Sequence, residues 1–199
     1  MGKLKEQSIL EAARKRFAYY GFSKVTMDEI AADVGMGKAS LYYYFPTKVE
    51  LFKSVVAEEQ DEFIEKLNKI LLTEISTADK MNQYMRERLK HFNSFVNLAK
   101  LSFQSIQELK PMFGDLHSNF IEREHKLLAA IIHDGIEKGE LKPGDSEKIA
   151  TSIVHVLHGL RLRTFPMRKY SDLDLALNEE LLEEMLFVLD MLLNGIQIQ

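Results

Sequence analysis

The stretch that most constrains the fold of this chain is residues 26–48, which read TMDEIAADVGMGKASLYYYFPTK. It contains start and stop signals for two short helices. Thr26 and Glu29 fit a capping box, in which each side chain caps the backbone amide of the other residue. Gly35 follows an apolar stripe at helical spacing, and glycine ends helices because the left-handed conformation costs it nothing. The stretch therefore predicts a helix, a tight turn and a second helix.

The second helix, expected from about Gly37 to Phe45, is too short to be stable alone. The residues on its two faces are therefore more informative than its helix propensity. Leu41, Tyr44 and Phe45 share one side, and Leu41 and Phe45 must pack inward. The opposite side presents a cation, a small residue and two phenols: Lys38, Ala39, Tyr42 and Tyr43. Such a face suits the major groove of DNA, where cations meet phosphate or guanine and methyl groups meet thymine. The pattern indicates a helix-turn-helix.

At these residues the chain resembles the TetR family of bacterial transcriptional regulators. The match is to the recognition-helix signature of that family, a small hydroxyl residue followed by Leu-Tyr-x-Tyr-Phe-x-x-Lys. Residues 40–48 read SLYYYFPTK. The upstream positions that also fit the family are Thr26, Ile30, Ala31 and Gly35. The resemblance covers residues up to about 50, and beyond them only the length and the helical layout agree.

The resemblance implies a sequence-specific DNA-binding regulator, most often a repressor, that binds a palindromic operator as a homodimer. We expect Lys38, Ala39 and Tyr42 to face bases, which give sequence choice. We expect phosphate contacts, which give affinity and position, from Ser40, Tyr43 and Lys48, and Thr26 completes the DNA-binding set. Two departures from the family pattern stand out: no hydroxyl residue opens the second helix at Met36 or Gly37, and Asp28 adds negative charge near the expected contacts.

The charge of the chain is unevenly distributed. The net charge is −4, yet residues 1–53 carry +3 and the remaining residues −7. A basic DNA-binding segment followed by an acidic remainder is the charge distribution expected of a DNA-binding protein. Four further cations are candidates for phosphate contact: Lys3, Lys5, Arg14 and Lys24.

Composition and motifs exclude several other classes of site. The absence of Cys excludes disulfides, thiolate zinc sites and cysteine nucleophiles. The sequence GMGKAS at 35–40 lacks the glycine and the hydroxyl residue that a phosphate-binding loop requires. Glu122 and His125 form half of a di-iron motif whose second half is missing. We therefore expect no enzyme activity, no cofactor and no metal site.

No apolar run approaches the ~18 residues of a membrane span, and no signal peptide precedes Lys3. We expect a cytoplasmic protein without a membrane segment.

The helical patterns predict an all-α fold in two parts. A helix at residues 5–20 completes a three-helix, helix-turn-helix DNA-binding domain in residues 1–47. A helix at 47–72, opened by a second capping box of Thr47 and Glu50, connects it to a helical ligand-binding and dimerisation domain in residues 48–199. Further helices are expected at 79–100, 102–109, 112–138, 146–164 and 174–195.

The last two helices, about 146–164 and 174–195, carry apolar residues over too wide an arc for one core contact. One face would pack on the core and the other on a second subunit, as a four-helix bundle between two copies. The alternative is a central helix buried within a monomer. The TetR resemblance implies the same dimer.

The middle helices are rich in aromatic and Met residues. In the TetR family these helices enclose a pocket for a small-molecule effector that releases the protein from DNA. The resemblance therefore implies a largely apolar cavity for a lipophilic ligand, although ordinary core packing is the alternative for each residue. The candidates are Tyr84, Met85, Phe92, Phe95, Phe103, Met112, Phe113 and Phe120, with His158 as a polar group.

A competing function is a ligand- or partner-binding helical dimer with weak or vestigial DNA binding. Salt dependence distinguishes the two, because a protein that neutralises ~6–10 phosphates loses affinity steeply between ~50 and ~200 mM salt.

Overall fold

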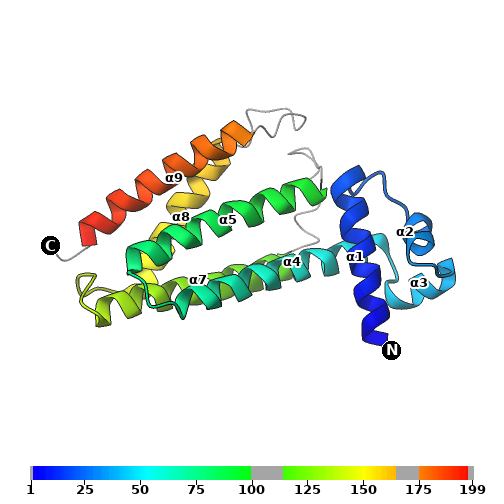
Figure 1. Cartoon of the computed structure of the whole chain (residues 1–199), viewed down its shortest axis with the longest axis horizontal. Helices are drawn as coiled ribbons and strands as arrows, with labels where there is room; N and C mark the ends of the chain where they lie inside the picture. Colours follow the sequence, from blue (N-terminus) through cyan, green and yellow to red (C-terminus); the bar gives the residue numbers. More distant parts are fainter. Residues whose placement is uncertain (1, 100–113, 165–174, 197–199) are drawn as a thin grey trace. The chain divides into compact units, whose positions relative to one another are not determined.

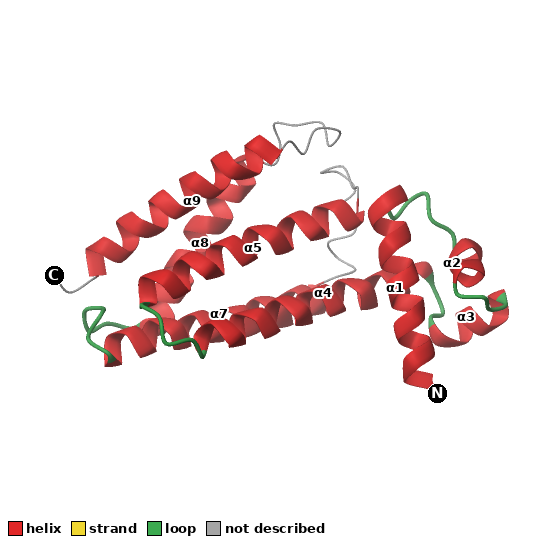
Figure 2. Cartoon of the chain, in the orientation of Figure 1, coloured by secondary structure: helices red, strands yellow, loops and turns green. Residues whose placement is uncertain are grey.

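A computed structural model describes residues 2–99, 114–164 and 175–196 of the chain (Figure 1). These ranges are helical and contain no strand (Figure 2), which confirms the all-α prediction. The helices are α1 (Gly2–Tyr20), α2 (Met27–Asp33), α3 (Lys38–Tyr44), α4 (Lys48–Leu71), α5 (Thr77–Ala99), α7 (Gly114–Glu137), α8 (Ser146–Thr164) and α9 (Leu175–Ile196). They match the expected ranges to within a few residues, and the helix expected at 102–109 lies outside the described residues.

The described chain forms two compact units. One comprises residues 1–61 and 91–116, and the other comprises residues 62–90 and 117–199, so far as each is described. The helix α4 is continuous through residue 61, so the two units are joined by a helix and not by a loop. The domain boundary expected between residues 47 and 48 stays a prediction.

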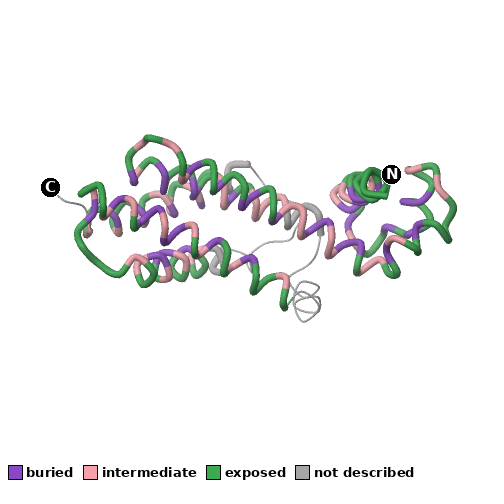
Figure 3. Tube along the Cα trace, turned by 90° about the horizontal axis from the view of Figure 1, so that it is seen from below, coloured by how far each residue is buried: buried purple, intermediate pink, exposed green. Residues whose placement is uncertain are grey.

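The helices α1, α2 and α3 share one apolar core with the first turns of α4 (Figure 3). The rings of Phe17 and Phe52 meet edge to face with centroids 5.1 Å apart, which joins α1 to α4. Fully burying each such side chain stabilises the fold by about 1.5–3 kcal/mol. The buried members of this core include Ile9, Ala13, Phe17, Val25, Ile30, Ala31, Leu41, Phe45, Leu51, Phe52 and Val55.

The second unit has its own core, in which a buried lysine braces three helices. The Nζ atom of Lys80 on α5 lies 2.8 Å from a carboxylate oxygen of Asp134 on α7 and donates to the carbonyl of Leu71 at 3.0 Å. A buried charge needs such a partner, because transfer from water is otherwise very costly. Lys80 therefore fixes α5 against α7 and the end of α4.

Candidate nucleic-acid interface

Local hydrogen bonds define the start of α2 as the sequence predicts. The hydroxyl of Thr26 accepts from the backbone amide of Glu29 at 3.3 Å, and the carboxylate of Glu29 accepts from the backbone amide of Thr26 at 2.8 Å. The hydroxyl of Thr26 also donates to that carboxylate, and this bond, followed by the one from the backbone, holds the pKa of Glu29 below its ordinary value. The capping box is therefore complete.

The turn between α2 and α3 depends on a glycine. Gly35 has a φ of +64°, in the left-handed region that a side chain disfavours. The next helix begins after Gly37, so no side chain caps the start of α3, as the sequence predicts. Its stability must come from packing, as expected for a helix of two turns.

The two faces of α3 differ as predicted. Leu41 and Phe45 are buried in the core of the first unit. Tyr43 is 86% exposed and Tyr42 is 39% exposed. The outward residues of α3 are Lys38, Ala39, Ser40, Tyr42 and Tyr43, and all are exposed. An α-helix with such a face can enter a major groove.

Lys38 is paired with an acidic residue of the preceding helix. Its ammonium lies 2.9 Å from a carboxylate oxygen of Asp28, and this hydrogen bond raises the pKa of Lys38. The same ammonium lies 6.0 Å from the ring centroid of Tyr42, within cation–π range. The first residue of α3 is thus held between α2 and the tyrosine one turn later.

Lys48 has other partners than the expected phosphate. Its ammonium donates to the carbonyls of Phe22 and Val25, each at 2.9 Å, and lies 4.6 Å from the ring centroid of Phe22. Burial lowers the pKa of this ammonium. In this structure Lys48 holds the loop between α1 and α2 against the start of α4.

The second capping box, expected at the start of α4, is half formed. The hydroxyl of Thr47 accepts from the amide of Glu50 at 3.0 Å. The carboxylate of Glu50 accepts from Lys53 at 3.2 Å in place of the amide of Thr47.

Two arginines of the first unit are used inside the protein. Arg14, one of the candidates for phosphate contact, lies 2.9 Å from Glu58 and 3.3 Å from Glu59, and it joins α1 to α4. Arg16 donates to both carboxylate oxygens of Asp33, which joins α1 to α2 and lowers the pKa of Asp33. The other three candidates, Lys3, Lys5 and Lys24, are exposed.

The residues predicted to bind a ligand differ in how deeply they are buried. Tyr84, Met85 and Phe120 are buried in the second unit, whereas Phe92 is half-buried and His158 is exposed. Exposure makes His158 a poor candidate for the wall of an enclosed cavity. The remaining candidates, Phe95, Phe103, Met112 and Phe113, lie outside the described side chains.

A buried ion pair beside these residues was not predicted from the sequence. Nε of Arg88 on α5 lies 2.5 Å from Oε1 of Glu124 on α7, and the hydroxyl of Tyr84 donates a hydrogen bond to the same oxygen at 3.1 Å. The other carboxylate oxygen, Oε2, is buried and has no hydrogen-bond partner among the described residues. Leaving such an atom unpaired costs about 1–3 kcal/mol or more.

A sequence signal for this pair does exist. Glu124 lies between Phe120 and Leu128 at i, i+4 spacing, so a carboxylate interrupts the buried stripe of α7. A charge at such a position is rarely buried without a partner. The partner lies 36 residues earlier on another helix, and sequence spacing alone cannot identify it.

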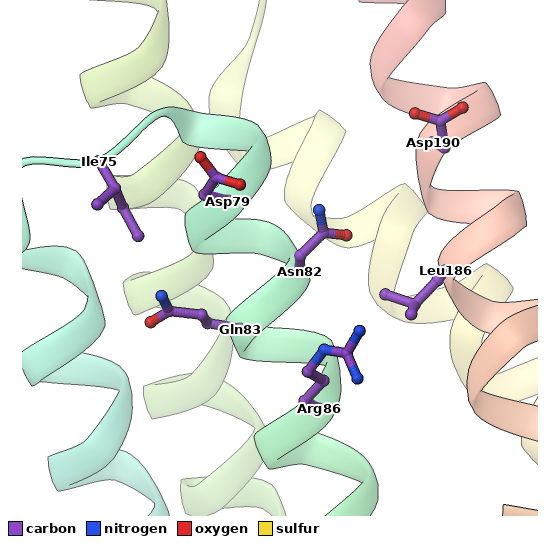
Figure 4. Close-up of a pocket in the computed structure, with 7 residues that line it drawn as sticks. All are labelled: Ile75, Asp79, Asn82, Gln83, Arg86, Leu186 and Asp190. Atoms are coloured by element: carbon purple, nitrogen blue, oxygen red, sulfur yellow. The ribbon is translucent and has the colours of Figure 1, made fainter. Parts of the chain in front are cut away.

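A surface hollow lies between α5 and α9 (Figure 4). Its volume is about 600 Å³, and its lining is largely polar: Ile75, Asp79, Asn82, Gln83, Arg86, Leu186 and Asp190. None of the predicted ligand-binding residues lines it. The hollow is therefore not the apolar cavity that the sequence predicts, and that cavity stays a prediction.

The described residues show neither a metal site nor a membrane-spanning helix. No group of three or more His, Asp or Glu side chains within them is arranged to hold a metal ion. Among the described helices, none combines the length and the apolar character that crossing a membrane requires.

The helix-turn-helix segment matches a known protein family, and the whole chain is similar to a solved structure. Residues 9–55 match the family model described as bacterial regulatory proteins, tetR family. The crystal structure of a transcriptional regulator from Cytophaga hutchinsonii is 40% identical, with a TM-score of 0.91 and full coverage of both chains.

Two curated relatives come from Bacillus subtilis. The uncharacterised HTH-type transcriptional regulator YhgD is 28% identical over 73% of this chain and 76% of its own length. The fatty acid metabolism regulator protein is 24% identical over 75% of this chain and 77% of its own length.

Proposed function

Because this chain belongs to the TetR family of bacterial regulatory proteins and is thus a DNA-binding transcriptional regulator, we propose that α3 reads a palindromic operator and that the protein acts as a repressor. The observation that carries this proposal is the division of α3 into two faces. Leu41 and Phe45 anchor the helix in the core, whereas Lys38, Ala39, Ser40, Tyr42 and Tyr43 are exposed. A helix fixed in this way presents a rigid face to a groove.

The proposed roles follow from side-chain chemistry. Lys38, Ala39 and Tyr42 contact base edges, where a cation meets guanine and a methyl group meets thymine. The hydroxyls of Ser40 and Tyr43 contact phosphates, which fix the register of the protein on the duplex. A DNA contact from Thr26, whose hydroxyl is used in the capping box, stays a prediction. Lys48 supports this surface by holding the loop of Phe22 to Val25. A direct phosphate contact from Lys48 remains a prediction.

We propose that two copies associate through α8 and α9. One face of α9 is buried within its own chain, through Leu181, Met185, Leu189 and Leu193. Another face leaves Phe187 65% and Met191 57% exposed, one turn apart. Large apolar side chains that are exposed and adjacent mark an interaction surface. A second copy would cover them and supply the second reading head, one helical turn of DNA (~34–36 Å) from the first.

We propose further that a small lipophilic molecule binds among the middle helices and releases the operator. The ligand must bind the DNA-bound and released states unequally, since equal binding shifts no equilibrium. A curated relative named as a regulator of fatty acid metabolism supports an apolar effector. We also expect the protein to act in the cytoplasm, where its DNA target lies.

Selection of bound duplexes from a random DNA pool tests the proposal. The native protein should enrich a palindrome, and Tyr42→Ala should lose that enrichment. Tyr19→Ala, which removes an exposed tyrosine outside α3, is the control and should retain it. If the folded native protein enriches no sequence, the competing function of a ligand- or partner-binding dimer with vestigial DNA binding replaces this one.

A further inference from the structure

The two carboxylate oxygens of Glu124 differ in their contacts: one has polar partners and the other has none among the described residues. The residue is 1% exposed on α7. Oε1 is ion-paired with Arg88 and accepts a hydrogen bond from the hydroxyl of Tyr84. Oε2 is buried without a hydrogen-bond partner in the described part of the chain. Buried polar atoms in folded proteins are nearly always paired, so an unpaired one requires an explanation.

The ion pair of Arg88 and Glu124 lies beside two aromatic rings. The guanidinium carbon of Arg88 lies 5.7 Å from the ring centroid of Phe63 on α4 and 5.3 Å from that of Phe120 on α7. The two rings are 5.7 Å apart, centroid to centroid. Three helices of the second unit thus place a charged pair among rings, and both rings are buried.

The charges of the cluster define which ligand it can accept. Arg88 and Glu124 neutralise each other, so the cluster has no net charge. An anionic ligand would place a second negative charge beside the carboxylate, and a cationic one would leave an uncompensated positive charge beside Arg88. Either arrangement is unfavourable where water is excluded. An uncharged hydroxyl or N–H group would complete Oε2 without changing the balance.

We propose that Glu124, with Arg88 and Tyr84, forms the polar end of a binding site for an uncharged, largely apolar molecule that carries a hydrogen-bond donor. The donor group bonds to Oε2, and the apolar body lies against the rings of Phe63 and Phe120. This inference rests on the proposed function, because it defines the chemical class of the effector. It excludes a free fatty acid, whose carboxylate at neutral pH has no donor to offer.

Two series of probes with a constant body and a variable head group test the proposal. One series is naphthol, methoxynaphthalene, naphthoate and naphthylmethylammonium. The other is decanol, decyl methyl ether, decanoate and decylammonium. Because the chain contains no Trp, naphthol fluorescence can be followed directly, and the decyl compounds can be ranked by displacement of naphthol or by calorimetry.

The alcohols should bind at least about tenfold more tightly than the ethers, since a hydrogen bond to a charged acceptor is worth that ratio or more. They should also bind more tightly than the acids and the ammonium compounds. If no head group is preferred in either series, or if an acid binds most tightly, the proposal is wrong and a water molecule satisfies Oε2.

A matched pair of substitutions locates the preference. Glu124→Gln removes the charged acceptor and should abolish the preference for alcohols. Glu122→Gln makes the same change two residues away on the exposed face of α7, where Glu122 pairs with Lys126, and should leave the ranking intact. Circular dichroism verifies that each variant is folded. An unchanged ranking in folded Glu124→Gln would overturn the assignment, and if this variant does not fold, the ranking by the native protein decides.

DNA binding is measured separately on the duplex selected above. Operator binding with no head-group preference would overturn this inference and leave the proposed function standing. A clear preference for alcohols in a protein that selects no operator would support this binding site and contradict the proposed function in DNA binding.

Discussion

Asp28 and Lys38 form the residue-scale feature that bears most directly on DNA binding. The ammonium that we propose to read a base is held 2.9 Å from a carboxylate of α2 in the free protein. DNA must compete with Asp28 for this lysine, and the carboxylate itself repels phosphates. We therefore infer that Asp28 lowers the affinity of this surface for any DNA.

We predict that Asp28→Asn increases affinity for the selected duplex about two- to fivefold at low salt, the range expected for an exposed charge pair. The gain should shrink as salt is raised, because exposed charges are screened. Fluorescence anisotropy at two salt concentrations measures both effects. Asp115→Asn, an exposed acid on α7, is the control and should change neither. Unchanged or weaker binding by Asp28→Asn would show that the pair does not oppose DNA binding.

One variant of Lys48 distinguishes a structural role in the protein from a direct contact with a phosphate. We predict that Lys48→Gln destabilises the protein by about 1–2 kcal/mol, because the carbonyls of Phe22 and Val25 lose a charged donor. Thermal denaturation followed by circular dichroism measures the loss. The slope of log affinity against log salt should stay unchanged. A slope reduced by about one, without loss of stability, would instead assign Lys48 to a phosphate.

At the scale of elements, most local signals in the sequence predict the structure correctly, although the capping box of Thr47 and Glu50 is only half formed. Long-range contacts are not predicted by the sequence. The capping box of Thr26 and Glu29 and the stop at Gly35 depend on residues within one turn, and the structure contains both. The faces of α3 followed from helical periodicity in the same way. The partners of Lys48 lie more than 20 residues earlier in the chain, and those of Glu124 lie on another helix. Sequence spacing does not encode such pairings.

The packing of α5 against α7 depends on a glycine. A Cβ atom at Gly135 would lie 2.3 Å from the hydroxyl oxygen of Thr77, whose side chain is buried. We predict that Gly135→Ala destabilises the protein by about 1–3 kcal/mol, as overpacking does. Gly114→Ala is the control, since nothing lies within 4 Å of the added atom at the start of α7 and alanine favours a helix. Thermal denaturation should lower the midpoint for the first variant only, and equal midpoints would show that α5 yields easily.

At the scale of the whole molecule, the proposed function requires two copies. The exposed face of α9 at Phe187 and Met191 is the surface we assign to the partner. The net charge is positive in residues 1–53 and negative in the rest of the chain. This distribution fits a first part that binds DNA and a second part that forms the dimer.

We predict that the native protein is a dimer in sedimentation velocity and that Phe187→Glu is a folded monomer, because a charge would be buried in the interface without a partner. Leu72→Glu is the control, as it alters an exposed apolar residue just after the end of α4 and should leave the dimer intact. A native monomer would contradict the proposed assembly, and a dimer that persists in Phe187→Glu would place the interface elsewhere.

The central claim is that the outer face of α3 reads base sequence, and one measurement tests it most directly. The affinity of native protein and of Lys38→Ala is determined for every single-base variant of the selected half-site. If Lys38 contacts a base, the variant should lose about 1–3 kcal/mol of discrimination at one or two positions and keep it elsewhere. Uniform weakening at all positions, with discrimination unchanged, would contradict the claim and reduce Lys38 to a phosphate contact.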